Sequence, residues 1–588
     1  MEPASSSGTT GNRQMKRWGP IVGVIAVVAV GGGVLVATQD SDDTDTADTV
    51  VTTVVDSTTG DTGATDTTTG DTEPGGITYP LSYSQAVEQG IADSIDWGER
   101  CDTTTGRIAV PDYFRSDCYA PFEGDNGGAT ASGVTADEIT IVYYEGKETD
   151  LITNYITSAI AVDDTNQDQF ATMAEIVRYY ETYYELYGRT INLVTYEATG
   201  ESDDDTVARA DAAAIAEQFH PFAVLNGPDF TSAFADELAA REIVCIGCTP
   251  SEPAEFFSDR DPYLFGLDGS AIQKQTHVLE FLQKQIVGKN AEYGGDAVKD
   301  SPRVFGYVYI DQGGSASPKE LADRMAAEME SLGAPFAEVV AYALDPFTIQ
   351  QTAALVINRM KSAGVTTIVF NGDPITPQSL TQEATAQEYF PEWIVAASTL
   401  VDVTAFARTY DQEQWQHAFG VTQLAARSNP LNAGAFANYV WFTGVEPPAD
   451  DTIGVFAVYP ALFFAVLQYT GPNLTAENFR DALFASPGTI QAISQPFLTY
   501  GDKGYWGGIA DYQGTDDATV FWWDATATGL DEIRREGTGM YQYVDGGKRF
   551  LPGEWPTEEK LFLPDGAVAI YDTAPAAEER GDYPSPAS

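Results

Sequence analysis

Hydroxyl groups follow one of the short apolar strands expected in this chain. The stretch 223–225 reads as a buried strand, and the polar loop that follows it ends in Thr231 and Ser232. The helix that begins near Thr231 would present unpaired backbone N–H groups and the positive end of its dipole at the same place. Such donors suit a ligand with hydrogen-bond acceptors, although either hydroxyl would serve equally to cap the helix.

A second strand, 243–246, runs into a loop that contains Cys248 and Thr249. In an open parallel sheet, ligands bind beyond the carboxyl ends of the strands, so we expect both loops at one binding site. A phosphate ligand is not expected there. Asp229 in the first loop would repel it, and the chain has neither the glycine motif of dinucleotide-binding proteins nor a P-loop.

Acidic side chains follow two strands in the second half of the chain. Asp311 comes after the strand 304–310, and Asp373 comes after the strand 366–370. Carboxylates in these positions would receive an ammonium group. Donors on one wall and acids on the other suit a zwitterion such as an amino acid. The structural alternative for Asp373 is a turn that its side chain forms before Pro374.

Four cysteines occur, all beyond the apolar N-terminal segment. Cys101 and Cys118 flank a 16-residue loop, and Cys245 and Cys248 form a C-x-x-C motif. In an oxidising exterior we expect two disulfides, Cys101–Cys118 and Cys245–Cys248. Zinc bound by four thiolates would want two short-spaced pairs, which the first pair does not provide. Thioredoxin-like exchange would place the C-x-x-C motif at the start of a helix rather than at the end of a strand.

Residues suited to catalysis are sparse. The three histidines, His220, His277 and His417, are scattered along the chain, and no G-x-S-x-G motif occurs. Metal-ligand spacings are also lacking in the sequence. We therefore expect a binding protein with no catalytic residues, no metal and no cofactor.

Apolar strands alternate with amphipathic helices from residue 134 onward, which predicts parallel strands joined by right-handed crossovers. The first series has strands 138–145, 190–197, 223–225 and 243–246, with helices 169–186, 206–218 and 231–241. The second has strands 304–310, 338–344, 366–370 and 393–397, with helices 272–287, 318–332, 349–363 and 377–389. This pattern predicts an α/β protein with two lobes.

Two apolar stretches late in the chain are expected to be structural. The helix 455–469, at about 15 residues, is short for a membrane span and reads as a core helix. Trp522, Trp523 and Tyr541 could stack on a ligand, but we expect them to seal a lobe or the hinge.

Charge excludes some partners. The chain has 31 basic and 87 acidic residues, a net charge of −56, and only 11 of the acids precede residue 76. Such a field repels nucleic acid and anionic lipid surfaces, so we expect neither as a partner. A hydrophobic content of 43% is that of a packed globular protein.

The N-terminus predicts a membrane anchor. Arg13, Lys16 and Arg17 precede the uncharged, mostly apolar segment 18–39. A helix of about 20 residues spans a bilayer, and the basic flank places the preceding end in the cytoplasm. A cleaved signal peptide is the alternative. The segment 40–76 is rich in Thr, Asp and Gly and predicts a disordered stalk. Under either reading the body of the protein lies outside the membrane.

Between residues 134 and 555 the sequence resembles the type I periplasmic-binding-protein family, in particular the branched-chain amino acid and amide class of ABC-transporter solute-binding proteins. The resemblance rests on the order and spacing of GVTADEITIVYYEG, RYYETYYELYGRTINLVTYEATG, VLNGPDFTSAFADELAAREIVCIGCTP, ADRMAAEMESLGAPFAEVVAYALDPFTIQQTAALVINRMKSAGVTTIVFNG and TAENFRDAL. It implies two Rossmann-like lobes, joined by a hinge of three crossings, that close on a ligand in a cleft without chemistry.

The same resemblance implies binding residues and partners. The expected ligand-binding residues are Tyr144, Phe230, Thr231, Ser232, Cys248, Thr249, Asp311 and Asp373. The implied partners are a small polar ligand, such as an amino acid or amide, and the permease subunits of an ABC importer. We expect a monomer on the cell surface, held by its N-terminal helix alone. A cell-surface sensor that is not coupled to transport is the alternative function.

The expected domain organisation has seven parts. They are a cytoplasmic basic segment (1–17), a transmembrane anchor or signal segment (18–39), an acidic linker (40–76), an N-terminal extension with a cysteine pair (77–133), lobe 1 (134–268 and 399–500), lobe 2 (269–398 and 501–555) and a C-terminal tail (556–588).

Overall fold

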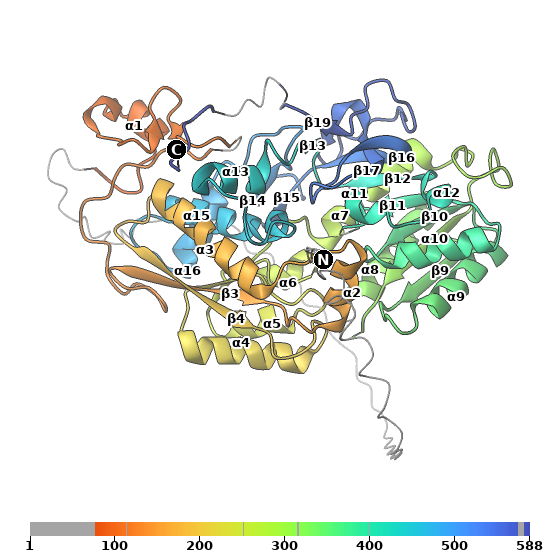
Figure 1. Cartoon of the computed structure of the whole chain (residues 1–588), viewed down its shortest axis with the longest axis horizontal. Helices are drawn as coiled ribbons and strands as arrows, with labels where there is room; N and C mark the ends of the chain where they lie inside the picture. Colours follow the sequence, from red (N-terminus) through yellow and green to blue (C-terminus); the bar gives the residue numbers. More distant parts are fainter. Residues whose placement is uncertain are drawn as a thin grey trace, which may run out of the picture. The chain divides into compact units, whose positions relative to one another are not determined.

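The computed structural model describes residues 77–112, 115–250, 252–313, 317–398, 400–573, 575 and 581–587. The expected cytoplasmic segment, membrane anchor and acidic linker lie outside these residues. Gly75–Ser588 form one compact unit, which Figure 1 shows coloured along the chain. Within this unit the chain builds two lobes, each around its own sheet.

Lobe 1 is built on a five-stranded parallel sheet with the order β4-β3-β5-β6-β7. Its strands are β3 (Glu138–Glu145), β4 (Thr190–Glu197), β5 (Ala223–Leu225), β6 (Val244–Ile246) and β7 (Leu264–Phe265). Its helices are α2 (Leu151–Ala159), α3 (Asn166–Tyr183), α4 (Asp205–Phe219), α5 (Ala233–Ala240), α6 (Ala254–Ser258), α13 (Gly434–Thr443), α14 (Ile453–Phe456), α15 (Val458–Thr470) and α16 (Ala476–Ala485). The expected strands of the first series are confirmed to within one residue.

The apolar helix α15 belongs to the core of lobe 1. Among the described residues, one stretch, Ile453–Thr470, is long and apolar enough to cross a membrane. Phe463 and Phe464 of α15 are fully buried in the core of lobe 1, and the Phe464 ring stacks on Tyr180 of α3 with ring centroids 4.7 Å apart. The structure therefore uses this stretch as a core helix, as the sequence predicted.

Lobe 2 is built on a larger sheet with the order β17-β16-β12-β11-β10-β8-β9. Its parallel strands are β8 (Phe305–Ile310), β9 (Glu338–Tyr342), β10 (Thr367–Asn371), β11 (Glu392–Ala396) and β12 (Ala418–Thr422), and the antiparallel strands β16 (Ala518–Leu530), β17 (Glu536–Tyr543) and β18 (Arg549–Phe550) extend it. Its helical elements are α7 (Ala271–Phe281), the π-helical turn η2 (Leu282–Ile286), α8 (Ser317–Ser331), α9 (Ile349–Ser362), α10 (Thr376–Ala386), α11 (Thr404–Ala407) and α12 (Gln412–Trp415).

The C-terminal aromatic residues complete the core of lobe 2. Trp522, Trp523 and Tyr541 lie on β16 and β17, and all three are buried. Trp523 donates its indole N–H to Gln412 at 2.9 Å, and Tyr541 donates its hydroxyl to the carbonyl oxygen of Val401 at 2.6 Å. These contacts give Trp523 and Tyr541 the structural role that the sequence predicted, and Trp522 packs on Phe562 with ring centroids 5.2 Å apart.

Three crossings join the lobes. The first follows β7, the second follows β12, and the third precedes β16. The third crossing contains the hairpin β14 (Leu498–Gly501) and β15 (Asp511–Thr515). Thr515 donates its N–H to the carbonyl oxygen of Leu267 at 3.1 Å, which ties the third crossing to the first. The hinge is therefore a hydrogen-bonded bundle of chain segments rather than three independent linkers.

The structure corrects two of the expected lobe boundaries. The prediction returned the chain to lobe 1 at residue 399, but β12 pairs with β11 in the sheet of lobe 2. Buried Val401 and Trp415 pack in the same core, so the return lies beyond Thr422. The prediction also ended lobe 1 at residue 500, whereas Tyr512 still packs in the lobe 1 core. The sequence shows apolar strands in these places but not which sheet each one joins.

The N-terminal extension and the C-terminal tail pack beside lobe 1 and along lobe 2. The extension contains α1 (Tyr83–Glu88), the 3-10 turn η1 (Ala92–Ser94), β1 (Cys101–Asp102) and β2 (Arg107–Ile108). The Cys101–Cys118 disulfide is present, with Cα atoms 5.6 Å apart. In the later part of the chain, β13 (Arg427–Ser428) pairs with β19 (Ile570–Tyr571). The 3-10 turn η3 (Val544–Gly546) lies between these two strands in the sequence.

Candidate functional site

The loops after β5 and β6 lie against each other at the carboxyl edge of the lobe 1 sheet. Their strands are adjacent and parallel, with Leu225 beside Ile246. A β carbon at Gly227 would stand 2.7 Å from the Cα atom of Cys248, so only glycine allows the two backbones to approach this closely. The two loops that the sequence places at one site therefore lie in contact, and their role in binding stays a prediction.

Ser232, Thr249 and Glu252 form a hydrogen-bonded triad where these loops meet. The Ser232 Oγ lies 2.9 Å from the Thr249 Oγ1 and donates to the Glu252 Oε1 at 2.5 Å. Thr249 has the carbonyl oxygen of Pro250 as a second acceptor, at 3.1 Å. The structure thus brings together two of the predicted residues, and the third member is a carboxylate that the sequence analysis did not select.

The Glu252 carboxylate is nearly enclosed. Its residue is 6% exposed, and among the described residues the hydroxyl of Ser232 is the hydrogen-bond donor to it. No Lys, Arg or His in the described part of the chain forms an ion pair with it. The backbone carbonyl of Glu252 accepts from the N–H of Ala271 at 3.3 Å, which links this loop to the first helix of lobe 2. A buried carboxylate with one donor is an incompletely paired charge.

Asp229 provides a second acidic group in the loop after β5. Its side chain is exposed, yet the surrounding protein displaces enough water to raise the pKa of its carboxyl from the usual value to about 6, with a smaller contribution from the charge of Asp150. In the described residues no hydrogen bond or ion pair neutralises the Asp229 carboxylate.

Tyr459 of α15 contacts the loop after β6. Its ring packs on Gly247, where a β carbon would stand 2.1 Å from a ring atom. Burial, followed by the charges of Asp229 and Asp268, raises the pKa of its hydroxyl. The side chain is half-buried, so one part of the ring contacts the loop while another part stays open. An aromatic face beside unpaired carboxylates is an arrangement that binds organic cations.

The structure gives other predicted lobe 1 residues internal contacts. Thr231 is buried and donates its hydroxyl to Asp205, and its Oγ1 accepts the N–H of Ala233 at 3.1 Å. Tyr144 is buried against Phe234, with ring centroids 4.5 Å apart. Both side chains stabilise the loops through contacts inside lobe 1.

Phe230 and Cys248, two further predicted residues, also contact other parts of the protein. Phe230 packs against the hydrophobic core of lobe 2 and therefore bridges the two lobes. Cys248 is buried, and the expected disulfide with Cys245 is present, with Cα atoms 5.9 Å apart. The Cys248 sulfur is engaged in this bond.

The two predicted acids of lobe 2 differ in their surroundings. The Asp373 Oδ1 accepts from the N–H groups of Ile375 and Thr376 at 2.8 Å each, and its Oδ2 accepts from the hydroxyl of Tyr342 at 2.7 Å. Asp373 is thus the turn-forming residue of the structural alternative. Asp311 accepts one hydrogen bond, from the N–H of Gly313 at 3.0 Å, and is half-buried, so its carboxylate has capacity for a ligand.

Helix α2 was not expected from the sequence. It follows β3 in lobe 1, and its side chains Ile152, Tyr155 and Ile156 pack against the core of lobe 2. Burial, with a contribution from Asp373, raises the pKa of the Tyr155 hydroxyl. The helix therefore lies against the carboxyl edge of the lobe 2 sheet and is a second bridge between the lobes, beside Phe230.

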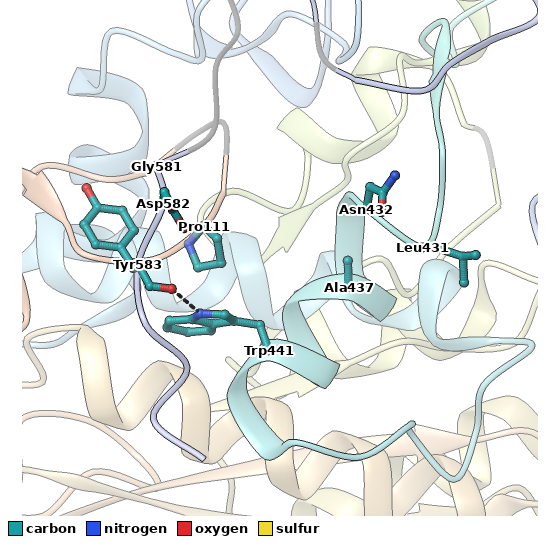
Figure 2. A pocket seen from close by; sticks show the side chains of 8 residues that line it. All are labelled: Pro111, Leu431, Asn432, Ala437, Trp441, Gly581, Asp582 and Tyr583. Carbon is teal, nitrogen blue, oxygen red and sulfur yellow. Dashed lines mark hydrogen bonds between the residues drawn. The ribbon is translucent and has the colours of Figure 1, made fainter. Parts of the chain in front are cut away.

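A cavity of about 370 Å³ lies away from the predicted site. Figure 2 shows that Trp441 of α13 and the C-terminal segment with Tyr583 line it, and the Trp441 indole N–H donates to the Tyr583 carbonyl at 2.9 Å. Pro111 of the N-terminal extension also lines it. None of the predicted ligand-binding residues takes part, so this cavity belongs to the packing of the two chain ends against lobe 1.

Three residues beside the predicted ones were not selected as ligand contacts from the sequence: Asp229, Glu252 and Tyr459. Asp229 was noted only as a group that disfavours phosphate. Glu252 lies three residues beyond Thr249, close enough in sequence for the same loop to reveal it. Tyr459 gave no signal, because it is more than two hundred residues away in the chain.

Comparison with solved structures finds proteins of similar fold. A solute-binding protein of an ABC transporter from Rhodopseudomonas palustris HaA2, in complex with p-hydroxybenzoic acid, is 11% identical with a TM-score of 0.49, over 73% of this chain and 100% of that one. The leucine-, isoleucine-, valine-, threonine- and alanine-binding protein from Brucella ovis is 14% identical with a TM-score of 0.47, over 72% and 98%. A fatty acid ABC transporter substrate-binding protein from Thermomonospora curvata is 14% identical with a TM-score of 0.46, over 69% and 94%.

The similarity is one of fold. No protein-family model matches the chain, and no curated protein matches it. The ligands named for the three solved proteins are an aromatic acid, a set of small uncharged amino acids and a fatty acid. A shared fold does not determine a ligand, so the function has to be inferred from the residues of this chain.

Proposed function

We propose that this protein is an extracytoplasmic solute-binding receptor that takes a small polar molecule between its two lobes. The observation that carries the proposal is the pairing of two parallel-sheet lobes through three hydrogen-bonded crossings, with unpaired polar groups at the carboxyl edge of lobe 1. In sheets of this type, ligands bind beyond the carboxyl ends of the strands. Such lobes open and close by bending at the segments that join them.

The histidines favour a binding protein over an enzyme. His277 is buried, its Nε2 lies 2.9 Å from the carbonyl oxygen of Asp516, and its Nδ1 accepts the indole N–H of Trp555 at 3.0 Å. Burial, the larger cause, lowers its pKa to about 4, so this ring is neutral. His417 bonds through its Nδ1 to the carbonyl oxygen of Tyr293. Both rings therefore have structural partners.

Delivery of the ligand to the permease of an ABC importer is the role that we propose for the receptor. We further propose that the apolar segment 18–39 anchors the protein in the membrane and that the acidic linker 40–76 spaces the folded body from it. The protein would act as a monomer. A surface sensor that binds the same ligand without transport is the alternative.

Native mass spectrometry of the purified protein tests the receptor function. A small molecule that is held in the native spectrum and released on denaturation would support it. A thermal-shift panel of amino acids, amides, amines and aromatic acids should then raise the melting temperature for one chemical class. An empty protein that responds to no member of the panel would contradict the proposal.

A further inference from the structure

We propose that the ligand presents a cationic group, an amine or a guanidinium, to the loops after β5 and β6, and that Glu252 selects for it. This inference rests on the receptor function proposed above and assigns the ligand class of that site. It reverses the polarity that the sequence suggested, in which hydroxyl donors of lobe 1 bind a ligand carboxylate.

The hydroxyl hydrogens at this point are already used. Ser232 has one hydroxyl hydrogen, and it goes to Glu252. The hydrogen of Thr249 has two acceptors within the chain, the Ser232 Oγ and the Pro250 carbonyl. A ligand carboxylate placed here would meet acceptor oxygens instead of donors.

The backbone donors at the start of α5 are used only in part. The N–H of Ala233, the first residue of the helix, is occupied by the Thr231 Oγ1. The N–H of Asp236 makes the first hydrogen bond within the helix, to the Ser232 carbonyl. The choice between an anion and a cation is therefore decided by the side chains of the two loops.

Glu252 needs a partner that the described chain does not supply. The residue is 6% exposed, and among the described residues its carboxylate receives one hydrogen bond. Burial of a charge is unfavourable unless the charge is paired and its remaining oxygen is hydrogen-bonded. Lys274, a cation at the start of α7, is paired with Asp268 at 3.3 Å. A ligand ammonium or guanidinium would complete the pairing of Glu252.

Asp229, in the loop after β5, and Tyr459, beside the loop after β6, add to the same electrostatic preference. Asp229 lacks a cationic partner among the described residues, and the charged group that acts on it is another carboxylate, Asp150. Tyr459 is half-buried beside the loop after β6, and an aromatic ring attracts a cation. Two carboxylates and an aromatic ring thus present one electrostatic sign, and that sign repels a ligand carboxylate.

Matched pairs of ligands that differ by one carboxylate test the inference. Cadaverine and lysine form one pair, and agmatine and arginine form the other. Calorimetric titration of the full chain should show the decarboxylated member binding about 10- to 100-fold more tightly in at least one pair. Glu252→Gln should abolish most of this ratio. Glu255→Gln, the same change at an exposed neighbour, should leave it unchanged.

A second variant tests the carboxylate of Glu252 separately from the hydroxyl of Ser232. Ser232→Ala keeps the Glu252 carboxylate and removes the hydroxyl, so the preference for the amine should persist. If the hydroxyl bound a ligand carboxylate instead, Ser232→Ala would weaken the amino acid selectively. Thermal melts of each variant confirm that it is folded before its binding is compared.

The outcomes distinguish this inference from the function beneath it. Tighter binding of the amino acid, or release of an anionic or neutral molecule on denaturation, overturns the assignment of charge and leaves the receptor function intact. Binding of neither member, with no molecule released, contradicts both. Release of an amine or guanidinium that Glu252→Gln no longer retains supports both.

Discussion

The side-chain carbonyl of Gln423 accepts the backbone N–H of Gly269 at 3.1 Å. The amide nitrogen of the same side chain donates to the carbonyl oxygen of Thr515 at 3.3 Å. Gln423 lies on the second crossing, Gly269 on the first and Thr515 on the third. One buried amide therefore holds all three connections between the lobes in register, at the place where the lobes must bend.

Loss of this amide should weaken the hinge. Gln423→Ala leaves a buried N–H and a buried carbonyl without their partner, which should lower the free energy of unfolding by about 1–3 kcal/mol. Urea unfolding measures this change in the free energy of unfolding. Gln416→Ala, at an exposed position, is the matched control and should change stability little. Equal effects of the two substitutions would show that the hinge does not depend on Gln423.

Asp311 and Asp373 should give opposite phenotypes. Asp311→Ala should weaken ligand binding without unfolding the protein, because one hydrogen bond from Gly313 is its contact in the described chain. Asp373→Ala removes the acceptor for the start of α10 and for buried Tyr342, so it should cost about 2–4 kcal/mol of stability. Titration with the co-purified ligand and urea unfolding of both variants measure the two effects. An unchanged affinity in Asp311→Ala would remove Asp311 from the site.

Affinity for a cationic ligand should depend on pH through Asp229. The surrounding protein displaces water from its carboxyl and, with a smaller contribution from Asp150, raises its pKa to about 6, so the carboxyl gains charge as the pH rises through that value. A bound cation favours the ionised form, and binding should therefore tighten from pH 5 to pH 7. Asp229→Asn should flatten this dependence. Tighter binding at pH 5 than at pH 7 would contradict this role of Asp229.

The stability of the protein should also depend on pH through Asp402, a buried acid in lobe 2. Burial, opposed in part by the hydroxyl of Thr422, raises the pKa of Asp402 to about 7, from an ordinary value near 3.8. A raised pKa in the folded state means that the unfolded chain loses its proton first, so folding becomes less favourable as the pH rises from about 4 to 7. Relative to Asp402→Asn, the unsubstituted protein should lose about 1 kcal/mol or more across this range. Urea unfolding at several pH values tests the sign.

The disulfide of the N-terminal extension should contribute measurably to stability. Cys101 and Cys118 are 17 residues apart in sequence, and closure of a loop of this size contributes about 3 kcal/mol. Replacement of both cysteines by alanine should lower the melting temperature. The Cys245–Cys248 pair closes a loop with a separation of 3, so its entropic contribution should be smaller. An unaltered melt of the first double variant would exclude a stabilising role.

Local sequence patterns predicted the elements of both lobes. The strand 138–145 alternates and then becomes continuously apolar, as a central parallel strand does, and it was found with the same bounds. The helix 349–363 was found as Ile349–Ser362, because its apolar residues recur at helical spacing. Helix α2 was missed because its residues Leu151–Ala159 mix threonine, isoleucine and asparagine, which are weak helix formers. Contacts with lobe 2 hold it in place.

The sequence by itself determined the fold class, the parallel direction of the alternating strands and the two loops that meet beyond β5 and β6. These properties follow from periodicity and from turn residues, which act over a few positions along the chain. Only the tertiary structure shows that β12 joins the sheet of lobe 2 and that the Asp373 carboxylate accepts hydrogen bonds within a turn. It also shows that the Ser232 hydroxyl bonds to both Thr249 and Glu252. A side chain's free hydrogen-bonding capacity depends on neighbours that folding brings together, and the spacing of residues along the chain does not encode it.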